Sequence, residues 1–190
     1  MNSTIPLKEK TTNSHNNIII VGIGNQLLGD EGLGLHVIDK LLQISVPSNV
    51  EVLDCGCDLL SLMSYLDKPE KIIIVDAICA GGKPGEIYRF DYSELGAGGI
   101  KMQSSHQVGA TDVLGLLKQI YPVLTGCEIV IIGVEPKAIE LSASLSERVR
   151  ESIADVLRLV FEEIYRGIPI SNRVGRSLNY GHGEFRQING

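Results

Sequence analysis

One stretch near the N-terminus, Ile18 to Leu42, constrains the fold more than any other part of the chain. It reads IIIVGIGNQLLGDEGLGLHVIDKLL: an apolar run of strand length, a loop broken by glycines, and an amphipathic run. This order is typical of α/β proteins, which build their sites where a strand ends and a loop leads into a helix. Two adjacent carboxylates, Asp30 and Glu31, stand at the point where the amphipathic run begins.

The rest of the chain continues the alternation of apolar strands and amphipathic helices. Hydrophobic periodicity and turn residues predict helices over 31–43, 59–66, 109–120 and 146–165, and strands over 17–22, 50–54, 71–77, 85–91 and 128–134. The first helix presents a stripe of Leu33, Val37 and Leu41 with Ile38 and Leu42 beside it, and Ser146 is the expected N-cap of the last helix.

Buried strands that alternate with helices predict a three-layer α/β/α domain, with a mostly parallel sheet between helices on both faces. Segment 85–91 alternates apolar and polar residues, which favours an edge strand and leaves room for an antiparallel one. We expect a single domain over 17–166, a polar N-terminal tail over 1–16 and a flexible C-terminal tail over 167–190.

Composition narrows the functional classes. The formal net charge is −6 and no dense run of Lys or Arg occurs, which argues against nucleic acid and anionic membranes as partners. The apolar runs are of strand length, shorter than the roughly 20 residues of a membrane span, and the N-terminus lacks the apolar segment of a secretory signal. The four cysteines form no CxxC pair. A reducing, cytoplasmic setting is therefore expected.

Three positions are candidates for chemistry. Asp30 is expected to cap the first helix, which leaves the adjacent Glu31 available for chemistry. Asp76 ends the most apolar strand, where a carboxylate is costly unless it is paired, hydrogen-bonded or bound to a metal. His106 lies in a polar loop before a helix, with Gln107 beside it. Two carboxylates and one imidazole suit a divalent cation such as Zn, Ni, Mn or Fe. Helix capping, loop capping and an inert loop histidine are the alternatives.

Other signals point to different classes of protein. Residues 22–27 begin like a dinucleotide fingerprint, but Leu27 replaces the third glycine and the following acids would repel a pyrophosphate. This leaves a non-enzymatic metal- or dinucleotide-binding module as one alternative. A thiol peptidase that uses Cys55 or Cys57 with His106 is the other.

Six motifs together resemble the hydrogenase maturation endopeptidases, which remove the C-terminal extension from the large subunit of nickel–iron hydrogenases. The resemblance covers residues from about 17 to about 165. In chain order the motifs are GIGNQLLGDEGLG (22–34), VLDCG (52–56), IIIVDAI (72–78), PGEIYRF (84–90), SSHQVGATDVL (104–114) and IIGVEPKAIE (131–140). The chain departs from the family where a Gly-Gly-Thr-like segment commonly follows Asp54, since Cys55-Gly56-Cys57 stands there.

The resemblance implies a twisted five-stranded sheet with one antiparallel strand. It implies that Glu31, Asp76 and His106 are the nickel-contacting and catalytic residues, and it places Asp54 next to the cleft. We expect Asn25, Asp54 and Gln107 to contact the substrate. The implied partner is a large-subunit precursor that carries nickel, and other divalent cations such as Zn or Cd fit the same ligands. The family is often grouped with the aspartic peptidases.

Overall fold

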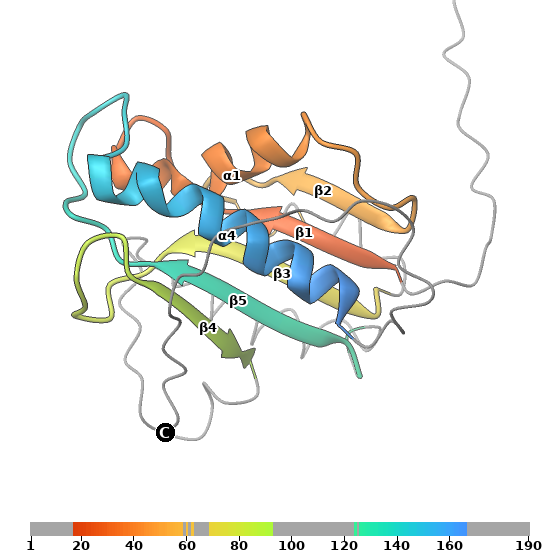
Figure 1. Ribbon diagram of the computed structural model, residues 1–190. Helices are drawn as coiled ribbons and strands as arrows, with labels where there is room; N and C mark the ends of the chain where they lie inside the picture. Colours follow the sequence, from red (N-terminus) through yellow and green to blue (C-terminus); the bar gives the residue numbers. More distant parts are fainter. Residues whose placement is uncertain are drawn as a thin grey trace, which may run out of the picture.

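The computed structural model describes residues 17–58, 60, 62, 69–92, 124 and 126–166. Five strands form one sheet in the order β2-β1-β3-β5-β4 (Figure 1). They are β1 (Ile18–Gly22), β2 (Val50–Asp54), β3 (Lys71–Ala77), β4 (Ile87–Asp91) and β5 (Glu128–Val134).

The strand directions confirm the predicted α/β class. β1 runs parallel to β2 and β3, and β3 runs parallel to β5. β4 is an edge strand that pairs antiparallel with β5, as the alternation in segment 85–91 had suggested. β3 and β5 have the predicted bounds because both are continuous apolar runs, whereas β4 begins two residues later, at Ile87, after the turn at Gly85.

Both faces of the sheet are buried, and residues two apart share a face. The two described helices, α1 (Leu33–Leu41) and α4 (Glu147–Tyr165), lie across the same face (Figure 1). There they pack on Ile20, Ile73 and Ile132. The opposite face carries Ile19, Ile72, Ile74 and Ile131, which join a second core cluster. The helices predicted over 59–66 and 109–120, and both predicted tails, lie outside the described residues, apart from Leu60 and Leu62.

The first helix begins later than predicted. A 3-10 turn, η1 (Asp30–Gly32), precedes α1, and α1 ends at Leu41. Gly34 allows this helix to approach the sheet, because a Cβ there would overlap the carbonyl oxygen of Ile23. Leu42 was expected beside the buried stripe, but it follows the last turn and is 64% exposed.

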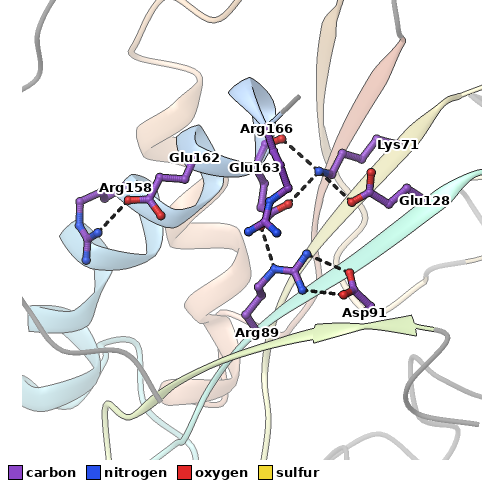
Figure 2. Close-up of polar contacts among 8 residues, drawn as sticks. All are labelled: Lys71, Arg89, Asp91, Glu128, Arg158, Glu162, Glu163 and Arg166. Atoms are coloured by element: carbon purple, nitrogen blue, oxygen red, sulfur yellow. Dashed lines mark hydrogen bonds and ion pairs between the residues drawn. The ribbon is translucent and has the colours of Figure 1, made fainter. Parts of the chain in front are cut away.

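A buried network of charges ties α4 to the edge of the sheet where the parallel strands begin (Figure 2). The Glu163 side chain is fully buried and accepts from Lys71 Nζ at 2.8 Å and from Arg89 Nε at 2.8 Å. Lys71 also pairs with Glu128, and Arg89 donates two hydrogen bonds to Asp91. The network joins β3, β4, β5 and α4, and it lies at the opposite end of the strands from Asp76.

Candidate functional site

The loop that follows β1 is shaped by a glycine. Gly24 has φ +142°, and a Cβ there would overlap the carbonyl oxygen of Glu31. Its N–H donates to Gly56 O at 2.9 Å, which ties the loop to the turn after β2. Gly24, which is part of the apparent dinucleotide fingerprint, therefore allows the loop after β1 to fold back against its own end at Glu31.

Glu31 and Asp76 form a buried pair of acids. β1 and β3 are parallel neighbours, so the loop after β1 and the end of β3 meet at one edge of the sheet. Each residue is only 2% exposed. Burial raises the pKa of Asp76 to about 7; a hydrogen bond from Ala77 N lowers it, and the negative charge of Glu31 raises it further. The predicted proximity of these two carboxylates is confirmed.

Asp30 does not cap the first helix as predicted, and it binds the N-cap residue of α4 instead. Its carboxylate makes no capping bond to the turn that it opens. Instead it accepts from Ser146 N at 2.6 Å, Ser146 Oγ at 2.8 Å and Lys137 N at 2.8 Å. Asp30 therefore lies at the N-terminus of α4, where the helix dipole favours a negative charge. Ser146 is the N-cap residue of α4 as predicted, but its hydroxyl binds Asp30 and makes no capping bond to α4 itself.

Glu135 is a buried acid that the sequence did not single out. It directly follows β5, and its carboxylate accepts from Ala80 N at 2.8 Å, Gly81 N at 3.3 Å and the Tyr88 hydroxyl at 2.9 Å. Burial and this hydrogen bond raise the pKa of Tyr88. Glu135 thereby holds the loop that leaves Asp76. A carboxylate directly after a buried strand was the available signal, and it is the same signal that identified Asp76.

The remaining predicted residues have local contacts or lie outside the described part of the chain. Asn25 Oδ1 accepts from Leu27 N at 3.0 Å, and Asp54 Oδ1 accepts from Gly56 N at 2.9 Å. Asn25 lies in the loop after β1, and Asp54 is the last residue of the neighbouring strand β2; their predicted contact with substrate stays a prediction. His106 and Gln107 lie outside the described residues. The structure therefore brings together two members of the predicted triad and leaves the third untested.

The cysteines do not present an activated thiol. Cys55 is buried in the core. Cys57 is exposed, and its Sγ lies 3.4 Å from Gly24 O. Burial, and then the charges of Glu31 and Asp76, raise the pKa of Cys57. A thiolate is the nucleophilic form of cysteine, so these surroundings disfavour the thiol-peptidase alternative.

The part of the chain that the structure describes does not by itself form a complete metal site. Within that part of the chain, no cluster of three or more His, Cys, Asp or Glu side chains could hold a metal ion. The two acids present suit a hard or borderline cation but leave a site incomplete.

Among the same described residues, no helix combines the length and apolar character needed to cross a membrane.

Comparison with known proteins identifies the family. The sequence model of the hydrogenase maturation protease family matches residues 35–163, a span that includes Asp76 and His106 and begins after Glu31. The chain belongs to the hydrogenase maturation protease family. It is therefore a peptidase, and its substrate class is protein.

Individual relatives agree with this assignment. A hydrogenase expression/formation protein, HupD, from Bradyrhizobium diazoefficiens is 32% identical over 169 residues, covering 86% of each chain. The solved [NiFe] hydrogenase maturation protease HybD from Thermococcus kodakarensis is 30% identical, with TM-score 0.66 over 77% of this chain and 98% of that one. The hydrogenase maturating endopeptidase HybD from E. coli is 29% identical, with TM-score 0.66 over 80% and 94%.

Proposed function

We propose that this maturation protease removes the C-terminal extension of a [NiFe] hydrogenase large-subunit precursor, and that it acts in the cytoplasm on precursor that already carries nickel. The observation that carries the proposal is the buried pair of Glu31 and Asp76 at the carboxyl ends of neighbouring parallel strands. Two carboxylates are too few ligands for a complete site, which suits a metal whose other ligands come from the substrate.

Glu31, Asp76 and His106 would contact the nickel of the precursor. Two oxygens and one nitrogen form an incomplete ligand set, so groups of the precursor would complete it. Recognition of the metal would then test whether the precursor is ready for cleavage. A Zn or Cd ion offered to the isolated protease would bind the same ligands.

As an alternative to contacting the nickel, Asp76 has the properties of a general base. Its pKa of about 7, raised by burial, matches the pH at which a base both remains available and accepts a proton readily. The bound nickel would polarise the scissile carbonyl or the attacking water, and the carboxylate would accept the proton of that water.

The experiment compares nickel-loaded and nickel-free precursor, with the released peptide identified by its mass. We expect cleavage of the loaded precursor alone. Asp76→Asn and Glu31→Gln should lower cleavage by orders of magnitude. Asp76→Asn should fold at least as well as the wild type at pH 8, because it removes a buried charge while its side-chain oxygen still accepts from Ala77 N.

Two outcomes would contradict the proposal. Equal cleavage of both precursors would show that nickel is not recognised. A fully active Asp76→Asn protein would show that the acid pair is not the site.

A further inference from the structure

The two loops that carry the acids are both bound to a third segment. This segment, residues 135–146, connects β5 to α4 and is called here the β5–α4 connection. At its start the Glu135 carboxylate binds the loop after Asp76. At its end Ser146 binds Asp30 through its N–H and its hydroxyl.

Backbone pairing reinforces both attachments. Gly29 N donates to Ser142 O at 2.9 Å, and Ser142 N donates to Leu27 O at 3.0 Å. The two residues before Glu31 are therefore both bound to the connection. Gly29 bonds through its backbone and Asp30 through its side chain. On the other side, Ile78 N donates to the O of Val134, the residue directly before the connection, at 2.9 Å, so the loop after Asp76 is also paired where the connection begins.

We propose that the β5–α4 connection is the positioning element of the acid pair, and that Asp30, Glu135 and Ser146 are positioning residues. Asp30 acts through Glu31, its neighbour in the same 3-10 turn. Glu135 acts through the loop that leaves Asp76. The inference rests on the proposed function, because it concerns the geometry of that site.

The chemistry of Asp30 makes it specific for this role. Its two oxygens accept three hydrogen bonds, and all three partners are donors. An ionised carboxylate offers acceptors only, whereas the amide group of Asn would direct a donor at another donor. The carboxylate is 2% exposed, and it accepts from the backbone and the hydroxyl of Ser146, the N-cap residue of a 19-residue helix. Asn is therefore not a conservative replacement at position 30.

The test compares four variants of the full chain: Asp30→Asn, Ser146→Ala, Ser146→Thr and Ser144→Ala. Ser146→Thr keeps the hydroxyl that Ser146→Ala removes. Ser144 is exposed in the same segment, and its side chain takes no part in the bonds to Asp30, so Ser144→Ala is the matched control. Precursor cleavage is measured as kcat and KM per folded molecule, well below the unfolding temperature of each variant.

Positioning predicts a loss in kcat with little change in KM. Removing a residue that orients a site commonly lowers activity 10–100-fold. We expect kcat to fall about tenfold in Ser146→Ala and about 100-fold in Asp30→Asn. Ser146→Thr should recover to within about twofold, and Ser144→Ala should match the wild type. A purely structural role would lower the unfolding temperature without lowering kcat of the folded molecules.

Amide hydrogen exchange tests the same inference without catalysis. The amides of Gly29 and Gly32 are hydrogen-bonded in the wild type and should exchange at least about tenfold faster in Asp30→Asn. Unchanged exchange together with unchanged kcat would overturn the positioning role. If Glu31→Gln is inactive while Asp30→Asn is fully active, the positioning role fails and the proposed function stands. If the wild type does not cleave precursor but exchange accelerates as expected, the proposed function fails and the β5–α4 connection still holds the loop.

Discussion

Replacing Glu163 by Gln tests how strongly the buried charge network stabilises the fold. The carboxylate is fully buried and accepts from Lys71 at 2.8 Å, from Arg89 at 2.8 Å and from Arg166 at 2.6 Å (Figure 2). Gln keeps the shape and one acceptor oxygen but removes the charge and directs an amide donor toward the cations.

The structure sets the size of the effect. Removing one partner of an isolated buried pair costs about 3–5 kcal/mol. Here Lys71 keeps Glu128 at 3.0 Å, and Arg89 keeps both bonds to Asp91 at 2.8 and 2.9 Å. Neither of the two buried cations is left alone, and the Arg166 side chain is 53% exposed to water. The loss should therefore approach that of one charge-assisted hydrogen bond, about 2–3 kcal/mol of the free energy of unfolding. For a chain of this size this corresponds to a fall of roughly 4–12 °C in the unfolding temperature.

Urea denaturation monitored by circular dichroism measures the change, with the m-value compared between proteins to confirm the same transition. Glu162→Gln is the matched control, because Glu162 neighbours Glu163 on α4 and forms an exposed pair with Arg158 at 2.8 Å. That control should lose less than about 0.5 kcal/mol. Equal stability of the two variants would refute the reasoning that burial gives the Glu163 network its strength.

Three further outcomes are expected. Hydrogen bonding to Arg89 lowers the pKa of Asp91. Burial raises the pKa of Glu163, but the hydrogen bonds and charges of Arg89 and Lys71 outweigh this effect, so the pKa of Glu163 lies below its ordinary value. Both groups therefore stabilise the fold at a pH above the ordinary pKa of a carboxyl group, and they lose this contribution as the pH falls below about 4. The difference in stability between the wild type and Glu163→Gln should therefore disappear in acid denaturation curves. Gly24→Ala should lower cleavage at least about tenfold and lower the free energy of unfolding by about 2 kcal/mol or more, because the added Cβ clashes with Glu31 O in the site loop. Gly56 also has a positive φ, but its Cβ would face open space, so Gly56→Ala should cost at most about 1–2 kcal/mol of stability and little activity. Cys57→Ser should retain precursor cleavage, and a folded but inactive protein would revive the thiol mechanism.

Elements whose signal is local are predicted correctly from the sequence. The predicted bounds of β3 and β5 agree with the structure at every residue. A short apolar run bounded by polar residues and turns predicts a buried strand where strands and helices alternate along the chain. The sequence also determined where the acids lie. Glu31 lies in the turn after β1 and Asp76 lies near the end of β3. The alternation makes these strands parallel neighbours, and the carboxyl ends of parallel strands meet at one edge.

The partners of the buried acids, in contrast, depend on how the whole chain folds. Asp30 and Ser146 lie 116 positions apart, and Glu163 and Lys71 lie 92 apart, so no local pattern records either contact. The sequence predicts that Asp30 caps the helix that it precedes, because a carboxylate at a helix start has the same sequence signature whichever helix its oxygens reach. Burial of a charged group depends on donors that arrive from distant segments. Local sequence can therefore indicate that a carboxylate needs partners, but only the folded chain determines which partners it has.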